Sequence, residues 1–459
     1  MKRTIHSIRI SFLVLALTAC VIDLPFLQGT NTATTSASTI PATVPVETAG
    51  SLLEAAPESL RGTTIHIWHA FTGPAATLFS TQLNEFNTGN EWGIILQQAA
   101  MLDYRTLFEE INTALEGNVL PDIVVVPPEF ALSWQQNVTD LTPYVEDPLY
   151  GLTDEEIADI PAIFWQQDEV EGFRLGVPAQ RTARLLVQNA TWAGELGMDS
   201  PPPDSESFRE QACAGNQAKK EDDVVSNDGY GGWVVDSDLY TSLSWLVAFK
   251  GGVFEYGQFN FNRPSNKDAL SFLKKLFDDS CAYLSTEPLS YTPLVNRSAL
   301  FTTVGLGDLT NVTRAFEISG SGDTWKVLPF PGKETAIIVY GPSYTIMQST
   351  RERQLAAWLF VRWLLSPERQ ARWVEKTGLF PLRNSSLDLL ADYRTGHPQW
   401  DEAVDLLSVA QGYPQTASWY EIKFILGDGV YSLFRMDIPG ENISDVLTDM
   451  DATTEELLH

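Results

Sequence analysis

Hydrophobic residues in the first part of the folded chain follow an alternation of strands and helices. The pattern predicts strands at 63–68, 93–97 and 123–126, with helices at 73–86 and 103–117 between them. The third strand is a continuous β-branched run, which is typical of a parallel strand buried on both faces. The order is a βαβαβ unit, so the sequence predicts an α/β fold with ligand contacts in the loops after the strands' carboxyl ends.

Later parts of the chain are richer in turns. Proline- and glycine-rich stretches at 200–204 and 227–232 are followed by helical periodicity at 265–277 and 354–365. Trp358 and Trp363 fall on the apolar stripe of the last helix, so we interpret them as core residues. The length after residue 60 is enough for a large core and favours two lobes.

The first 20 residues have the pattern of an export signal. A basic start precedes a short apolar run at 8–16, which is shorter than the ~20 apolar residues of a membrane-spanning helix. The segment Leu17-Thr18-Ala19-Cys20 resembles the bacterial lipobox. That resemblance implies cleavage before Cys20 and lipidation of its sulfur, and an ordinary signal peptide with an incidental cysteine is the alternative. The prediction is an exported protein, lipid-anchored to the outer face of the cytoplasmic membrane, at the cell surface or in the periplasm.

Residues 21–60 are predicted to form a flexible tether. From Gly29 to Gly50 the chain is almost entirely Thr, Ala, Ser, Pro and Val, which cannot bury enough apolar surface to offset the entropy of ordering. A flexible chain of this length spans on the order of 35 Å.

Charge and cysteine content narrow the possible partners. Thirty basic and 59 acidic residues give a net charge of −29, which repels nucleic acid and anionic lipid headgroups. We therefore expect no nucleic-acid partner and contact with the membrane only through the anchor. We also expect a monomer. Apart from Cys20, the cysteines are Cys213 and Cys281. In an exported protein such a pair favours one disulfide, contributing roughly 4 kcal/mol, although two unpaired buried thiols also fit the spacing.

Several motifs occur in the order found in one protein family. They are Pro-Asp-Ile-Val-Val at 121–125, Val-Thr-Asp-Leu-Thr-Pro-Tyr at 138–144, Gly-Phe-Arg-Leu-Gly-Val-Pro at 172–178 followed by 185–189, Tyr-Gly-Pro-Ser-Tyr-Thr-Ile at 340–346, Lys-Thr-Gly-Leu-Phe-Pro at 376–381, and 414–422 with its Trp-Tyr pair. The ordered set resembles the extracellular solute-binding proteins of ABC importers, in the carbohydrate-type, maltose-binding-protein-like class, over nearly all of 61–459. Two segments depart from the family pattern: Val187-Gln188-Asn189 lacks the usual aromatic pair, and 305–308 lacks a frequent tryptophan.

The resemblance implies a two-lobed, type II periplasmic-binding-protein-like fold, with a ligand cleft between lobes that are joined by hinge crossings. By analogy, the first lobe comprises 61–178 plus 308–365 and the second 179–307 plus 366–459. The implied function is capture of a sugar or oligosaccharide in the cleft and its delivery to the ABC permease subunits.

Candidate ligand-binding residues follow from their positions in the predicted loops and from the resemblance. They are His69, Phe71, Thr72, Glu129, Phe130, Arg181, Tyr240, Asp308, Tyr340 and Trp419. Aromatic rings would cover the apolar faces of a sugar, and planar polar groups would bind its hydroxyls; Trp419 matches a late stacking tryptophan of the family. Each also has a structural alternative: an aromatic ring can be core, Glu129 and Asp308 can be plain surface acids, and Arg181 can be a salt-bridge partner.

Motifs for metal binding and catalysis are weak. His66 and His69 lack further ligands at zinc spacing, and Gly305-x-Gly307 lacks the third glycine of a dinucleotide fingerprint. We expect no metal, no cofactor and no enzymatic activity. The same fold binding a polyamine or another small solute remains an alternative, as does an exported glycan-acting enzyme, which would require two carboxylates at a fixed separation. The few basic residues in the predicted loops argue against a phosphate ester.

Overall fold

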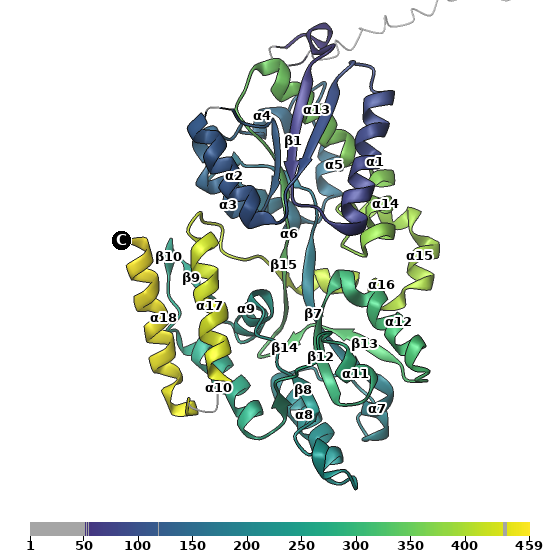
Figure 1. Ribbon diagram of the computed structural model, residues 1–459, viewed down its shortest axis with the longest axis vertical. Helices are drawn as coiled ribbons and strands as arrows, with labels where there is room; N and C mark the ends of the chain where they lie inside the picture. The colour runs from purple at the N-terminus through teal and green to yellow at the C-terminus, as the bar shows by residue number, and fades with distance from the viewer. Residues whose placement is uncertain (1–50, 52, 54, 118, 435–437) are drawn as a thin grey trace, which may run out of the picture. The chain divides into compact units, whose positions relative to one another are not determined.

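A computed structural model of the chain describes residues 51, 53, 55–117, 119–434 and 438–459. These residues fall within the unit Ala49–His459 (Figure 1). The predicted signal peptide, the lipidated Cys20 and the tether up to residue 50 lie outside the described residues, so they stay predictions.

The ordered body begins before the predicted end of the tether at residue 60. Ser51 Oγ donates to Asp147 Oδ2 (2.9 Å), Leu53 packs against the core, and a 3₁₀ turn at Pro57–Leu60 ends on the fully buried Leu60. The tether boundary is corrected on this point. The Thr/Ser/Ala/Pro-rich composition ends at Gly50, and the leucines after it have apolar surface to bury.

The first lobe is built on a sheet that, among the described residues, has five strands in the order β2-β1-β3-β16-β6. Their bounds are β2 Ile95–Ala100, β1 Thr64–His69, β3 Ile123–Val126, β16 Ser343–Ile346 and β6 Val177–Pro178. β1 runs parallel to β2 and β3, while β16 runs antiparallel to β3 and β6. The predicted βαβαβ unit is confirmed.

Helices cover both faces of this first sheet. As a result, β3 is buried along its whole length. Ile123 and Val125 share a core with α1 (Gly73–Gly89) and α13 (Arg351–Leu364). Val124 and Val126 point the other way and pack with α2 (Tyr104–Gly117) and α3 (Pro128–Ser133). Shorter elements of this region are α4 Thr142–Val145, α5 Asp154–Ala158, α6 Ala162–Trp165, the 3₁₀ turns at Gln135–Asn137 and Gln166–Asp168, and the hairpin of β4 Glu169–Val170 with β5 Phe173–Arg174.

The second lobe is built on a mixed sheet with the order β11-β8-β12-β7-β15-β14 in the described chain, with β13 beside β7 and β17 beside β15. Their bounds are β11 Ala282–Tyr283, β8 Gly231–Val234, β12 Ala299–Gly305, β7 Thr182–Asn189, β15 Thr335–Tyr340, β14 Phe330–Pro331, β13 Trp325–Leu328 and β17 Ala410–Gln411. Its helices are α7 Ala190–Glu195, α8 Ser205–Lys220, α9 Leu239–Ala248, α10 Pro264–Asp278, α11 Thr292–Val295 and α12 Leu309–Ser319, with the hairpin of β9 Phe254–Glu255 and β10 Gln258–Phe259.

The predicted disulfide is confirmed. Cys213 on α8 and Cys281, which immediately precedes β11, are bonded, with their Cα atoms 4.4 Å apart. The bond ties a helix of the second lobe to the edge strand of its sheet.

In the described part of the chain, three passages connect the two lobes: β6 to β7, β15 to β16, and the segment that leaves α14 (Pro367–Thr377) for α16 (Pro398–Asp405). Within the third passage lie a 3₁₀ turn at Asn384–Leu389 and α15 Ala391–Gly396. The prediction assigned 308–365 to the first lobe and 366–459 to the second, which differs from this arrangement. β13, β14 and β15 pair in the second sheet, and α14 packs against α1 of the first lobe. Long-range strand pairing of this kind leaves no local pattern in the sequence.

The chain ends in two helices on the second lobe, α17 Trp419–Leu433 and α18 Ile443–Leu458, which lie side by side (Figure 1). They pack against α9 and α10, and α17 also contacts α3 of the first lobe. Of the helices in the described residues, none combines the length and apolarity needed to cross a membrane.

Candidate functional site

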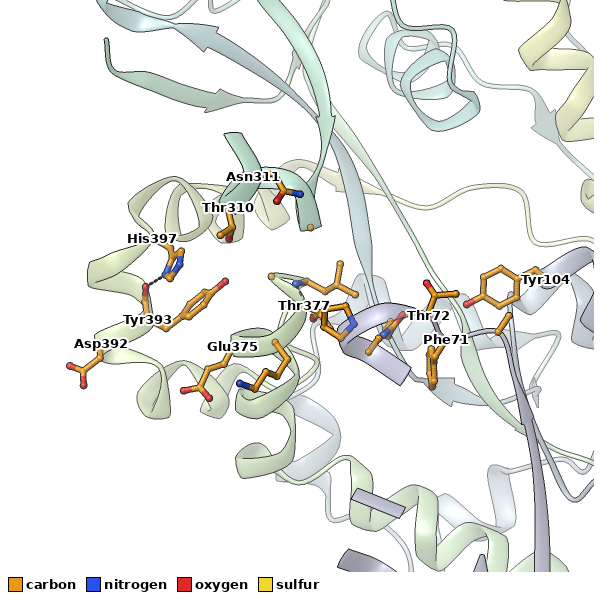
Figure 2. A pocket seen from close by; sticks show the side chains of 18 residues that line it. Phe71, Thr72, Tyr104, Thr310, Asn311, Glu375, Thr377, Asp392, Tyr393 and His397 are labelled. Atoms are coloured by element: carbon orange, nitrogen blue, oxygen red, sulfur yellow. Dashed lines mark hydrogen bonds between the residues drawn. The ribbon is translucent and has the colours of Figure 1, made fainter. Parts of the chain in front are cut away.

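A cavity of about 990 Å³ lies where the loop after β1 faces α12, the end of α14 and α15 (Figure 2). Its lining comprises Ala70, Phe71, Thr72, Pro74, Ala75, Tyr104, Gln180, Gly307, Thr310, Asn311, Glu375, Lys376, Thr377, Gly378, Leu379, Asp392, Tyr393 and His397. Volumes of this size hold small organic ligands, and the lining comes from both lobes and from the passages between them.

His69 shapes the first-lobe wall without lining the cavity. It is the last residue of β1 and is buried; its Nε2 lies 3.0 Å from Gln98 Oε1, and its Nδ1 accepts from the Phe71 N–H (3.1 Å). Burial lowers the pKa of His69, against the opposing effect of the Gln98 hydrogen bond, so the neutral imidazole is favoured. The predicted ligand residue His69 therefore stabilises the loop that contains Phe71 and Thr72.

Phe71 and Thr72, both predicted, do line the cavity. Thr72 is the N-cap of α1, but its exposed side chain makes no capping hydrogen bond, so the hydroxyl is available to a ligand. Phe71 packs edge-on against Phe79 of α1 (5.1 Å between ring centroids) and is largely buried.

Three helices begin at the cavity: α1 at Gly73, α2 at Tyr104 and α12 at Leu309. The first N–H groups of a helix have no partner within the helix, and the helix dipole makes this end positive. At α2 the Thr106 N–H already donates to Asp103 Oδ1 (2.7 Å), and at α12 the Leu309 N–H donates to the Leu306 carbonyl oxygen. These two ends therefore contribute mainly the positive end of the helix dipole.

The opposite wall comes from α12, α14 and α15. Figure 2 shows Thr310 of α12 pointing toward the Tyr393–His397 pair. The Tyr393 and His397 rings stack 4.0 Å apart, and His397 Nδ1 donates to the Tyr393 carbonyl oxygen (2.8 Å). The predicted Asp308 immediately precedes α12 and accepts a hydrogen bond from Asn311 Nδ2 (3.2 Å), so it lies at the cavity's edge.

Glu129 and Phe130 are placed away from the cavity. Glu129 is 1% exposed and accepts from Tyr413 Oη and Lys423 Nζ, each at 3.0 Å. Because both donors belong to the second lobe, the carboxylate joins α3 to the C-terminal segment. Phe130 is buried edge-on against the ring of Tyr420 (4.7 Å).

The predicted ligand residues Tyr240 and Tyr340 lie together, but their rings face each other. Their rings lie parallel with centroids 3.5 Å apart, and Tyr413 packs edge-on against Tyr240. Burial raises the pKa of both hydroxyls, so they stay protonated. Neither ring is part of the cavity lining.

Trp419 is fully buried, and its ring runs parallel to Phe259 at 6.2 Å. In this structure it has no free face for a ligand. Its neighbour Tyr420 instead stacks on Phe108 of α2 (4.4 Å), across the boundary between the lobes. Consecutive helix residues point about 100° apart, so only one of the pair can face the core.

Arg181 is also fully buried and has Asp168 as its ion-pair partner (2.8 Å). Its neighbour Gln180 reaches the cavity instead. Gln180 Nε2 is buried and has no hydrogen-bond partner among the described residues.

Of the lining residues, only Phe71 and Thr72 were among the predicted candidates; the others include Tyr104, Gln180, Asn311, Tyr393 and His397. The first three lie within four residues of a predicted loop or candidate, so a wider window around each strand end would have included them. Tyr393 and His397 lie on α15, which follows no strand, and no pattern pointed to them.

Within the described residues, no group of three or more His, Cys, Asp or Glu side chains is arranged to hold a metal ion. The lining offers hydroxyl, amide, carboxylate, imidazole and aromatic groups and the Lys376 ammonium.

Comparison with known proteins relates this architecture to a protein family. Residues 81–406 match the family described as bacterial extracellular solute-binding protein. The sn-glycerol-3-phosphate-binding periplasmic protein UgpB of Salmonella typhimurium is 21% identical over 341 residues, which span 72% of this chain and 77% of that protein.

Solved structures share the fold. The sugar-binding protein MalE from Xanthomonas citri aligns with a TM-score of 0.73 and 20% identity, over 86% of this chain and 97% of MalE. UgpB from Mycobacterium tuberculosis, solved in complex with glycerophosphocholine, aligns with a TM-score of 0.69 and 17% identity, over 86% and 98% of the two chains. These likenesses confirm the predicted two-lobed α/β fold.

Proposed function

The chain belongs to the bacterial extracellular solute-binding proteins, and from this membership we propose that it captures a sugar or oligosaccharide and delivers it to an ABC permease. The observation that carries the choice of solute is the cavity of about 990 Å³, whose lining joins aromatic rings to hydroxyl and amide groups. We propose this cavity as the solute site.

The lining suits the two surfaces of a sugar ring. Tyr104 and Tyr393 offer aromatic faces for its C–H patches. Thr72, Gln180 and Asn311 offer donors and acceptors for its hydroxyls. No catalytic step is part of the proposal.

The charge of the lining separates a sugar from the phosphate-bearing solutes named for the UgpB relatives. Its ionisable side chains include the carboxylates Glu375 and Asp392, but Lys376 is the one ammonium, and no arginine is among the lining residues. Recognition of phosphate favours guanidinium forks or ammonium groups, so an uncharged polyol fits better. The two carboxylates also keep a cationic solute such as a polyamine as a second candidate.

Lobe closure would convert binding into a signal for the transporter. A solute that contacts both walls stabilises the closed form by its differential affinity for that form. The proposed lipid anchor at Cys20 and the proposed tether would keep the protein near the permease while leaving the lobes free to close.

A thermal-unfolding screen tests the function. Maltotriose, glycerol 3-phosphate and spermidine represent the three solute classes, and a ligand at 100 times its Kd stabilises by about 2.7 kcal/mol. We expect a raised midpoint with an oligosaccharide of the panel, and no new product on chromatography. A response to glycerol 3-phosphate alone would refute the sugar assignment, and released monosaccharide would refute a purely binding role.

Variants then test the cavity. Asn311→Ala and Tyr393→Ala should each weaken binding of the stabilising sugar by roughly 3- to 10-fold. Tyr256→Ala is the matched control, because Tyr256 is 96% exposed at the tip of the β9–β10 hairpin and is not part of the lining. Equal affinities for the Tyr393→Ala and Tyr256→Ala proteins would place the solute elsewhere.

A further inference from the structure

Arg181 lies where the three passages between the lobes meet. It follows β6 of the first sheet and directly precedes β7 of the second, and its side chain is 0% exposed. A guanidinium is buried only at high cost unless it is paired and hydrogen-bonded. Its partners therefore indicate what the side chain does.

One nitrogen of the Arg181 guanidinium hydrogen-bonds to both the first and the second passage. Nη1 donates to the carbonyl oxygens of Gln180 (2.9 Å), Pro342 (2.8 Å) and Gly341 (3.3 Å). Gln180 belongs to the passage from β6 to β7, whereas Gly341 and Pro342 form the passage from β15 to β16. One NH₂ group thus bridges two segments that are far apart in sequence.

The other NH₂ group fastens this junction to the body of the first lobe. Nη2 donates to Asp168 Oδ2 (2.8 Å), Ser343 Oγ (3.1 Å) and the Phe164 carbonyl oxygen (3.3 Å). Ser343 Oγ in turn donates to the second oxygen of Asp168. Nε alone of the three nitrogens has no partner among the described residues.

The third passage reaches the same residue through the backbone. The Phe380 N–H donates to the Arg181 carbonyl oxygen (3.1 Å) just after α14 ends. All three passages therefore hydrogen-bond to Arg181, by side chain or by main chain.

The passages are also in direct contact beside Arg181. Ala179 N–H donates to the Pro342 carbonyl oxygen (3.0 Å). Gly341 has a φ of +150°, and a Cβ there would lie 2.3 Å from the Gln180 carbonyl oxygen. Only glycine fits this approach.

We propose that Arg181 is a positioning residue that makes the three passages move as one hinge and so limits the orientations the two lobes adopt. It would act on solute capture through Gln180, the adjacent residue, whose amide lines the cavity. The inference rests on the proposed function only in that lobe closure serves capture.

The test measures lobe orientation without any solute. Spin labels at Asn84→Cys on α1 and Lys220→Cys on α8, both exposed positions, report the distance between lobes by double electron–electron resonance. Arg181→Met should broaden the distance distribution relative to the otherwise unchanged labelled protein. The matched control is Arg353→Met, which removes an arginine paired with the buried Asp122 inside the first lobe (2.5 Å).

Loss of stability alone would affect both arginine variants and leave the distance distribution unchanged. A distribution for Arg181→Met no wider than that for Arg353→Met would therefore overturn the proposal. Arg181→Lys keeps the charge opposite Asp168 but lacks the planar guanidinium, so its distance distribution should stay as broad as that of Arg181→Met. A distribution of wild-type width for Arg181→Lys would also overturn the proposal.

Ser343→Ala decides the question if Arg181→Met fails to fold, because it removes one partner of the guanidinium without leaving a charge unpaired. A broadened distribution would support the hinge role, and an unchanged one would overturn it. Since no solute is added, a negative sugar screen and a negative spin-label result remain distinguishable.

Discussion

Removing the Cys213–Cys281 disulfide should destabilise the second lobe by about 4 kcal/mol. The bonded cysteines are 68 residues apart, and a cross-link of that span lowers the entropy of the unfolded chain by roughly 15 cal/mol/K in the chain-entropy treatment. Because proteins are commonly stable by only about 5–15 kcal/mol, this is a large share of the total.

The perturbation is the double variant Cys213→Ala/Cys281→Ala, compared with the wild type with and without reductant. Urea unfolding gives the change in free energy, and native-state hydrogen exchange locates it. Since the bond ties α8 to β11, exchange should accelerate in those elements before it does in β1 of the first lobe.

Two results would refute this reasoning. A free energy of unfolding within about 1 kcal/mol of the wild-type value would show that the cross-link does not restrict the unfolded chain as expected. Equal acceleration of exchange in both lobes would show that its effect is not confined to the second lobe.

Three further outcomes follow from the buried polar and aromatic groups. Lys423→Met should lower the free energy of unfolding by about 3–5 kcal/mol, because it leaves the buried Glu129 carboxylate without its charge partner. In urea unfolding, adding Glu129→Gln should recover part of this loss, and additive losses in the double variant would contradict the coupling. Burial lowers the pKa of His69 in the folded protein, so as the pH falls below about 6.5 this histidine is protonated in the unfolded chain before it is in the folded one. The wild type should therefore lose more stability between pH 7 and 5.5 than His69→Gln does. Trp419→Ala should lower the unfolding midpoint by more than Tyr393→Ala, because its ring is fully buried, and an isothermal titration in which it alone abolished sugar binding would contradict that placement.

The strands of the first sheet could be predicted because their signals are local. The β-branched run of β3 and the glycine and proline before α1 each act within a few residues. The pairing of β16 with β3 could not be predicted in this way, because it joins residues 123–126 to 343–346. The predicted lobe boundaries relied on analogy and missed the position of β15 for the same reason.

The candidate site was predictable only where a strand end fixed it. Phe71 and Thr72 follow β1 and line the cavity, and their role as ligand contacts stays a prediction. Glu129 and Arg181 were predicted as ligand-binding candidates, and the partners that bury them come from distant segments. The choice between ligand contact and internal pairing depends on those partners.

The repeated passage of the chain between the lobes has a consequence for how the protein folds as it leaves the cell. The first sheet lacks β16 until residues 343–346 have emerged, and the second lobe lacks its last two helices until the chain is nearly complete. Neither lobe can close its core from an N-terminal fragment, and contacts between such distant segments form slowly. The packing of both lobes is therefore complete only once β16, α17 and α18 have taken their places.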